Sequence, residues 1–265
     1  MVSFDKIAIY VSTLCYAIVL FAARCLDIYW KLIGVIIISS FQSIMEGFDF
    51  SYLLGLLMGI VPSLICITLH ELSHGLVAYS LGDDTAKKMG RLSLNPLKHL
   101  DPMGMLMMLV FHFGWAKPVP VNMYRFKNPR RGMAVTALAG PLSNILAALV
   151  FLFIYGFSLV PLCRSEAGMY IHKMIELTAY ISVGLAVFNL IPVPPLDGSK
   201  VLFSLVRDEA YYKLMRYERY GSIIMFALVA AGVFGKPLSR LISGIFVFMT
   251  PVGQAGLDLY IRIFI

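Results

Sequence analysis

Charged residues are scarce in this chain: they make up 14% of its 265 residues, whereas 59% are hydrophobic. An ordinary soluble domain carries about 25% charged residues, and its apolar residues come in short periodic patches. Here the apolar residues come in long blocks, which is typical of an integral membrane protein. The net charge is +7, but no basic stripe with interleaved aromatic residues is present, so we do not expect nucleic acid as a partner.

Cysteine and histidine are also rare, with four and five residues respectively. The cysteines are scattered and form no C-x-x-C pair, which argues against a disulfide framework and a structural zinc knuckle. No cleavage site of the A-x-A type precedes Arg24, so we interpret Ile7–Ala23 as a retained transmembrane anchor and not as a signal peptide.

Long uncharged runs predict an all-α polytopic membrane protein. Most of them approach or exceed the roughly 20 residues that a spanning helix needs. One run is shorter and is expected to be tilted or only partly inserted, so the prediction is about six or seven transmembrane helices. The runs are Ile7–Ala23, Leu32–Met45 (the short one), Phe50–Leu69, Gly132–Cys163, Leu177–Leu196, Tyr220–Gly235 and Leu241–Leu257.

Basic residues lie in the loops between these runs. The loop Gly82–Arg131 carries nine Lys or Arg against three Asp, and the segment Gly198–Arg219 carries five against three acids. Two predicted spans separate the two segments, so both fall on one side of the membrane. The positive-inside rule makes that side cytoplasmic, where the basic residues also meet anionic lipid headgroups.

An H-E-x-x-H motif, from His70 to His74, directly follows the uncharged run Phe50–Leu69. Ionisable residues at membrane depth are costly, so they usually serve a function. On a helix, positions i and i+4 share one face, so both imidazoles point at one metal ion, and Glu71 can take a proton from a water molecule there. Cys66 lies one turn before His70; a small residue at a helix contact is a simpler interpretation of it than a fourth ligand.

A catalytic zinc takes three protein ligands and keeps one position open, so the two histidines need a further donor. The candidates are His99, His112, His172 and the carboxylates. Asp197 is favoured because it closes the apolar segment Asn189–Gly198, whose three prolines prevent a continuous helix. Irregular backbone at membrane depth is buried in protein or lines a cavity. The alternative is an aspartate that only caps the next helix.

Asn144 is a polar residue deep in the run Gly132–Cys163, roughly 20 Å from Arg131 at about 1.5 Å per helical residue. An amide at that depth can donate a hydrogen bond to developing oxyanion charge or hold the substrate backbone. Hydrogen bonding between helices beside Gly140 and Pro141 is the competing interpretation.

The stretch Pro102–Ala116 is apolar but short and broken by glycine, and Lys117–Asn122 alternates proline with valine. This pattern predicts a short re-entrant or β-like segment after the helix that carries the H-E-x-x-H motif. An exposed strand at Val119 and Val121 could pair with a substrate helix that has locally unwound.

Six motifs in order resemble those of the site-2 protease family of intramembrane zinc metalloproteases (peptidase M50 type). The resemblance covers about residues 55–205, and the ordered set is far more specific than H-E-x-x-H alone. The motifs are His70–Gly75, Gly90–Pro96, His99–Gly104, Phe113–Asn122, Ala139–Asn144 and Pro194–Gly198.

The resemblance implies that His70, His74 and Asp197 bind Zn2+. It also implies that Glu71 is the general base or acid and that Asn144 stabilises the substrate or the transition state. The expected reaction is hydrolysis of a peptide bond within the transmembrane helix of a single-span membrane-protein substrate, inside the lipid bilayer and near its cytoplasmic side.

The expected organisation is N-terminal membrane anchor segments in residues 1–45, an intramembrane metalloprotease core in residues 50–205 and C-terminal transmembrane segments in residues 206–265. Many family members carry a PDZ insertion or a nucleotide-sensing domain, and this sequence has neither, which predicts a minimal form. The compact loops favour a prokaryotic cell membrane. No oligomeric state is predicted.

Two other functions use the same residues. A metal transporter would hold its ion in transit at a broken helix. An inactive membrane scaffold would bind helices without cutting them. The complete ligand set together with a base favours the protease.

Overall fold

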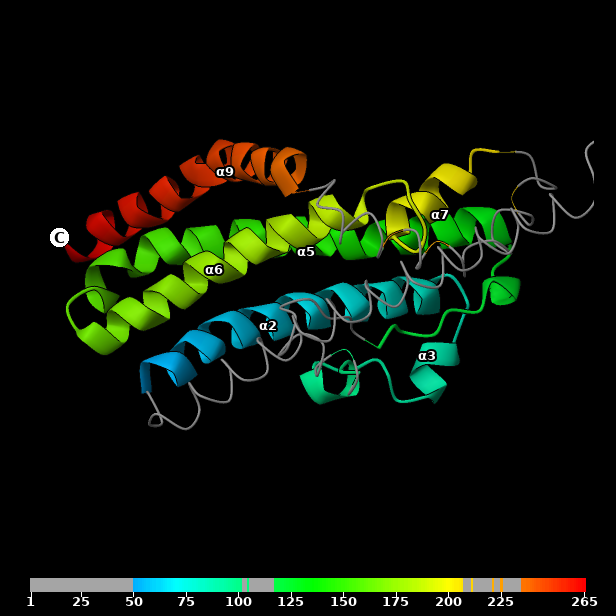
Figure 1. The fold of residues 1–265 in the computed structure, drawn as a ribbon, viewed down its shortest axis with the longest axis horizontal. Helices are drawn as coiled ribbons and strands as arrows, with labels where there is room; N and C mark the ends of the chain where they lie inside the picture. Colours follow the sequence, from blue (N-terminus) through cyan, green and yellow to red (C-terminus); the bar gives the residue numbers. More distant parts are fainter. Residues whose placement is uncertain are drawn as a thin grey trace, which may run out of the picture. The chain divides into compact units, whose positions relative to one another are not determined.

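The computed structural model describes residues 50–101, 104, 117–206, 211, 221, 225 and 235–265 (Figure 1). The chain divides into two compact units, Met1–Gly55 and Leu56–Ile265, and every residue of the candidate site lies in the second. Within the described residues there are helices and no β-strand, which agrees with the predicted all-α class. The elements are α2 (Phe50–Ser80), α3 (Thr85–Lys88), α5 (Pro129–Leu162), α6 (Glu166–Asn189), α7 (Asp197–Phe203) and α9 (Gly235–Phe264), with the 3-10 turns η1 (Pro96–Lys98) and η2 (Met123–Arg125).

Four of these helices are long and apolar enough to cross a bilayer. The candidate spans are Leu57–Ser80 in α2 and the whole of α5, α6 and α9, with 24, 34, 24 and 30 residues. The predicted helices after Phe50, Gly132 and Leu241 therefore agree with α2, α5 and α9. Length and apolar composition are enough to predict such helices because about 20 apolar residues suffice to span the hydrocarbon core.

Helix α6 begins earlier and ends sooner than the uncharged run that predicted it. Its first turns contain Lys173 and Glu176, which form an ion pair at 2.6 Å, so a criterion based on uncharged residues missed this part of the helix. Ser165 caps the helix by accepting a hydrogen bond from the Gly168 N–H at 3.2 Å. The helix ends at Asn189 because prolines follow it.

Several predicted segments lie outside the described residues. These are the runs Ile7–Ala23 and Leu32–Met45, the run Tyr220–Gly235 apart from three single positions, and the stretch Pro102–Ala116 apart from Gly104. The predicted total of six or seven spans therefore stays a prediction.

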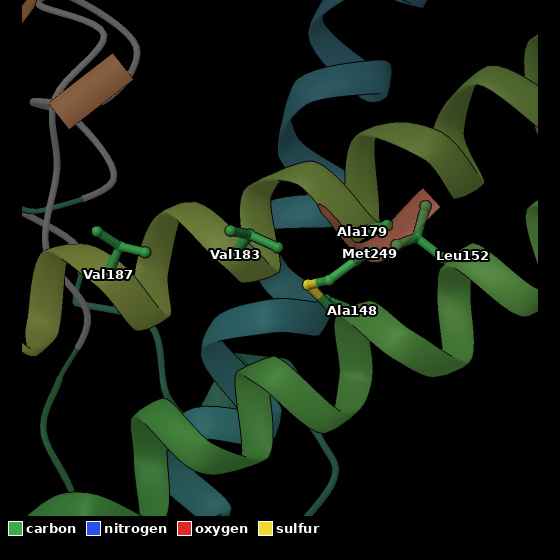
Figure 2. Packing of buried hydrophobic residues seen from close by; sticks show 6 residues of the cluster. All are labelled: Ala148, Leu152, Ala179, Val183, Val187 and Met249. Atoms are coloured by element: carbon green, nitrogen blue, oxygen red, sulfur yellow. The ribbon is translucent and has the colours of Figure 1, made fainter. Parts of the chain in front are cut away.

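Helix α5 contacts both α6 and α9, and α5 and α6 run side by side (Figure 1). Small residues allow this packing, because a Cβ on Gly156 would lie 1.7 Å from the carbonyl oxygen of Gly253 on α9. The buried core between the three helices is aliphatic (Figure 2). It comprises Ala148 and Leu152 of α5, Ala179, Val183 and Val187 of α6, and Met249 of α9.

Two further contacts place the elements that carry the candidate site. Helix α7 packs against α5, and its start lies close to the residue that follows α6, since a Cβ on Gly198 would lie 2.3 Å from the Leu190 carbonyl oxygen. Helix α2 is joined to α6 through Cys66, whose buried Sγ lies 3.0 Å from Ser182 Oγ and donates to the Thr178 carbonyl at 3.4 Å. This is the behaviour expected of a small residue at a helix contact.

Candidate metal centre

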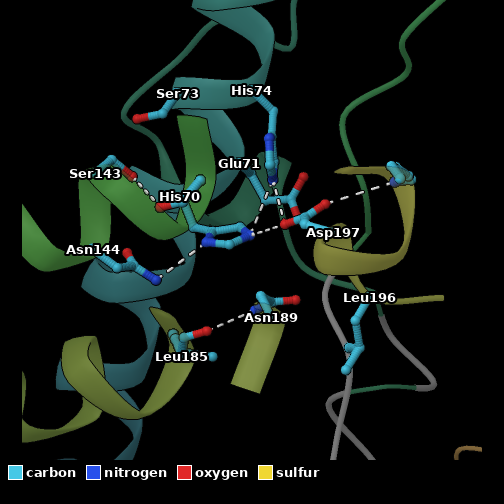
Figure 3. Close-up of polar contacts among 12 residues, drawn as sticks. His70, Glu71, Ser73, His74, Ser143, Asn144, Leu185, Asn189, Leu196 and Asp197 are labelled. Carbon is cyan, nitrogen blue, oxygen red and sulfur yellow. Dashed lines mark hydrogen bonds and ion pairs between the residues drawn. The ribbon is translucent and has the colours of Figure 1, made fainter. Parts of the chain in front are cut away.

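Three side chains predicted as metal ligands come together between α2 and α7 (Figure 3). Oδ2 of Asp197 lies 3.1 Å from Nε2 of His70 and 3.1 Å from Nε2 of His74. The two Nε2 atoms are 3.0 Å apart, and all three side chains are buried. Among the described residues, His70, His74 and Asp197 form a group of potential metal ligands whose donor atoms all lie within 4.8 Å of one another.

Helix geometry explains why the two imidazoles meet. His70 and His74 are four residues apart on α2 and therefore project from one face. Their rings cross almost at right angles, with centroids 4.6 Å apart, so the two Nε2 atoms converge on one point. Asp197 comes from the first turn of α7, a part of the chain 127 residues after His70.

The other nitrogen of each imidazole has its own partner on α5. Nδ1 of His74 donates to the Thr136 carbonyl at 2.7 Å, so in the neutral imidazole, which is the form that binds metal, the lone pair is on Nε2. Nδ1 of His70 lies 3.1 Å from the side-chain amide of Asn144, whose Oδ1 is buried without a partner. Half a turn of that amide brings Oδ1 to accept the Nδ1–H, which would orient His70 in the same way.

Gly140 lets α5 approach the two histidines. A Cβ at this position would lie 2.4 Å from Nε2 of His74 and 2.6 Å from Nε2 of His70. Real Cβ atoms essentially never approach this closely, so glycine is needed here. The two imidazoles therefore pack against α5 at its alanine-glycine-proline motif.

The three donors fit zinc. Two imidazole nitrogens and one carboxylate oxygen form a typical set for a catalytic zinc, with a fourth position left open. Ligands at about 2.0–2.1 Å around a tetrahedral ion are about 3.3 Å apart, close to the separations of 3.0 and 3.1 Å found here. The buried imidazoles are also oriented by outer partners, as in known zinc sites.

Asp197 is held in its charged form. Burial raises the pKa of this carboxyl, but hydrogen bonds with His70 and His74 and the charges of His74 and Lys200 lower it, and the net effect is a pKa below the usual range. Lys200 contributes from α7 itself, with Nζ 3.7 Å from Asp197 Oδ1. A charged carboxylate is the form that binds metal.

Glu71 lies beside the cluster and faces a cavity of about 380 Å³. Its Oε2 accepts a hydrogen bond of 2.7 Å from the backbone N–H of Val119. Val119 and Val121 line the same cavity, although the segment around them has no regular secondary structure. Val119 is almost fully buried, so it is not the exposed strand residue that the sequence suggested.

The other candidate ligands lie elsewhere. His99 is buried in the loop after α3, where its Nε2 donates to the Ser93 carbonyl at 2.8 Å. His172 packs at the other end of the helices, with Nδ1 3.2 Å from Ser158 Oγ and its ring stacked on Tyr155. His112 lies outside the described residues.

Comparisons with known proteins agree with this centre. Residues 162–232 match Peptidase family M50. The protein named "Putative zinc metalloprotease YwhC" of Bacillus subtilis (strain 168) is 38% identical over 209 residues, covering 77% of this chain and 90% of its own. The chain belongs to peptidase family M50. This is the site-2 protease family that the sequence motifs resembled.

Two more distant relatives carry the same kind of name. Rip2 of Mycolicibacterium smegmatis is 26% identical, covering 75% of this chain and 76% of its own. MJ0611 of Methanocaldococcus jannaschii is 31% identical, covering 59% of this chain and 76% of its own. No solved structure is significantly similar to this chain. The M50 protein is thus a membrane metalloprotease, and zinc is its cofactor.

Sequence reasoning missed three features of this M50 centre. The Thr136 carbonyl is a backbone group, so the type of residue at position 136 does not predict its contact with His74. Lys200 follows Asp197 by three residues, a spacing that places both on one helix face and could have been noticed. Gly140 lies inside a motif used for the family resemblance, but its contact with the histidines depends on how α5 packs against α2.

Proposed function

We propose that this M50 protein is an intramembrane zinc metalloprotease that hydrolyses peptide bonds within transmembrane helices of membrane-protein substrates. The single observation that carries the proposal is the convergence of Asp197 of α7 on His70 and His74, which lie beside Glu71 within the candidate span Leu57–Ser80. His70 is 13 residues from Leu57 and 10 from Ser80, the ends of that span. At about 1.5 Å per residue, it is roughly 20 Å and 15 Å from them, near mid-membrane depth.

His70, His74 and Asp197 would hold the zinc, and Glu71 would move the proton. Bound zinc supplies a Lewis acid that polarises the scissile carbonyl and the attacking water. Glu71 takes the proton of that water and passes it to the leaving amine nitrogen. Its Oε2 is suited to this role because it faces the cavity and is held by the Val119 N–H at 2.7 Å.

For Asn144 we propose an orienting role through His70, alongside the predicted contact with the transition state. The amide is fully buried and lies 3.1 Å from His70 Nδ1. Residues of this kind tune a metal ligand by fixing its ring and its tautomer. The two roles differ in a measurable way, because the first changes zinc affinity and the second changes turnover at full zinc occupancy.

Substrate is proposed to bind along the segment from Lys117 to Asn122. The carbonyls of a helix are hydrogen-bonded, so the substrate must unwind before attack and can then pair as a strand. The backbone N–H groups of successive residues in an extended segment point to opposite edges, and those of residues i and i+2 point to the same edge. Val119 directs its N–H to Glu71. An extended segment would place the N–H of Val121 on the same edge, whereas Pro118 and Pro120 have no N–H to offer on the other.

The finer topology also remains a proposal. We infer about six or seven spans, with the protease core in residues 50–205 flanked by membrane segments in 1–45 and 206–265. The segment after α2 would be re-entrant. Both basic segments would lie on the cytoplasmic side of a prokaryotic cell membrane, which places the centre nearer that side.

The test is cleavage of a single-span reporter protein in proteoliposomes by the wild type, Glu71→Gln and Glu166→Gln. Glu166 is the matched control, an exposed glutamate in the first turn of α6. We expect Glu71→Gln to lose about 10²–10⁴-fold in rate while keeping its zinc, because general-base catalysis contributes about that much. Glu166→Gln should cleave normally.

Three outcomes would count against the proposal. Normal cleavage by Glu71→Gln would remove the glutamate from the mechanism. Zinc flux into the vesicles without cleavage by the wild type would indicate a transporter. Binding of the reporter helix without cleavage, at full zinc occupancy, would indicate a scaffold.

A further inference from the structure

The segment from Lys117 to Asn122 is held in place by two buried charged residues outside the metal centre, Arg91 and Asp83. The segment has no regular secondary structure of its own. Two of its residues are prolines, which lack an N–H. Its position therefore depends on the groups that bind its remaining backbone atoms, which are the His99 carbonyl, accepting from the Lys117 N–H at 2.9 Å, and three side chains.

Arg91 binds the backbone at the start of the segment. Its Nη2 donates to the Lys117 carbonyl at 2.6 Å and to the Pro118 carbonyl at 3.2 Å. Only 8% of the arginine is exposed. A buried cation needs such partners, and hydrogen bonds from a charged donor are about twice as strong as neutral ones.

Asp83 binds the backbone at the end of the segment. Its Oδ2 accepts a hydrogen bond of 2.6 Å from the Asn122 N–H, and its Oδ1 accepts from the backbone N–H of Thr85 at 3.0 Å and from the Thr85 hydroxyl. The side chain is completely buried. One carboxylate thus ties the segment to the loop that leaves α2, the helix that carries Glu71.

Between the residues bound by Arg91 and by Asp83, Val119 donates its N–H to Glu71. These three side-chain attachments and the bond from the Lys117 N–H to the His99 carbonyl all occur within six residues. A shift at either end therefore changes the position of Val119 and of the carboxylate that it holds. Gly75 makes room for this arrangement, because a Cβ there would lie 3.1 Å from a methyl carbon of Val119.

We propose that Arg91 and Asp83 are positioning residues that fix the register of the segment from Lys117 to Asn122 beside Glu71. This inference rests on the proposed function, in which an unwound substrate pairs with that segment. A fixed register presents one substrate bond to the metal centre. A loose segment presents neighbouring bonds as well, and it holds Glu71 less well.

The test compares Arg91→Ala, Arg91→Lys and Asp83→Asn with two matched controls, Lys98→Ala and Asp84→Asn. Exposed Lys98 donates to the Gly90 carbonyl at 3.0 Å in the same loop as Arg91. Asp84 is next to Asp83 and shares Arg125 with it, since Arg125 Nε lies 3.9 Å from Asp83 Oδ1, but Asp84 also pairs with Lys88 and makes no hydrogen bond to the segment. Each control thus removes a polar contact without removing a hydrogen bond to the segment, and Asp84→Asn also shows what a weaker hold on Arg125 does by itself.

Three quantities are measured: kcat and KM on the single-span reporter, the termini of the products by mass spectrometry, and amide hydrogen exchange of the peptide that covers residues 117–122. For Arg91→Ala and Asp83→Asn we expect kcat/KM to fall by about 10- to 100-fold, the usual effect of losing a charged hydrogen bond. The products should show additional termini next to the wild-type cleavage site, and exchange in the peptide should be faster. Zinc content should not change.

Arg91→Lys should regain much of the lost activity and the single cleavage site, because one nitrogen makes both contacts and an ammonium can replace it. A residue that only supports folding would lower the amount of active protein without adding product termini. Unchanged termini together with exchange no faster than in the controls would overturn the inference. If the wild type does not cleave, the proposed function fails, while the exchange measurement still tests the attachment of the segment.

Discussion

Replacing Gly140 with alanine tests whether the two histidines form the metal centre. The added methyl carbon would lie 2.4 Å from Nε2 of His74 and 2.6 Å from Nε2 of His70. Ordinary contacts between such atoms are about 3.5 Å long, so either the imidazoles or helix α5 must move by about 1 Å. The methyl group thus acts directly on the two nitrogen atoms that would bind zinc.

The size of the effect follows from how little movement a metal site tolerates. Ligand distances in zinc sites vary by about 0.2 Å, so a shift of about 1 Å removes at least one histidine from the ion. Loss of a residue that merely orients a ligand costs about 10- to 100-fold in affinity, and displacement of the ligand itself should cost about 100-fold or more. If α5 moves instead, the overpacking should destabilise the protein by about 1–3 kcal/mol.

The assay is zinc content after competition with a graded series of chelators, measured with reporter cleavage and thermal unfolding. Gly59→Ala is the matched control: it makes the same substitution in α2, where a Cβ meets nothing within 4 Å. This control should keep its zinc and gain slightly in stability, because alanine is favoured over glycine inside a helix by about 0.5–1 kcal/mol. Wild-type zinc affinity and cleavage in Gly140→Ala would refute the assignment of the histidine pair.

Three further predictions concern the same centre. Asn144→Leu should lower zinc affinity by about 10- to 100-fold if the amide orients His70, and chelator competition measures this; a lower kcat at unchanged affinity would support contact with the transition state instead. Asp197→Asn should lose zinc and activity, whereas Asp258→Asn, at an exposed position on α9, should lose neither; equal zinc content in both variants would exclude Asp197 as a ligand. Removal of zinc with a chelator should abolish cleavage, and added zinc should restore it; cleavage that survives complete removal would contradict zinc dependence.

Much of the helical framework could be predicted from the sequence, because a spanning helix needs only enough apolar residues in a row. The ends of the helices were harder to predict. Helix α6 starts in a charged stretch with Lys173 and Glu176, where an ion pair and a serine cap stabilise turns that look polar in the sequence. The valine segment looked exposed, but packing against α2 buries Val119.

The sequence by itself determined the histidine pair, because a spacing of four residues on a helix leaves no choice of face. Only the tertiary structure shows which carboxylate completes the set, because Asp197 is 127 residues from His70 and meets it through the packing of α7 on α5. The same holds for the partners of the two imidazoles on α5 and for the Val119 N–H at Glu71. These contacts join groups that no local pattern connects, and they exist because close helix packing brings them together.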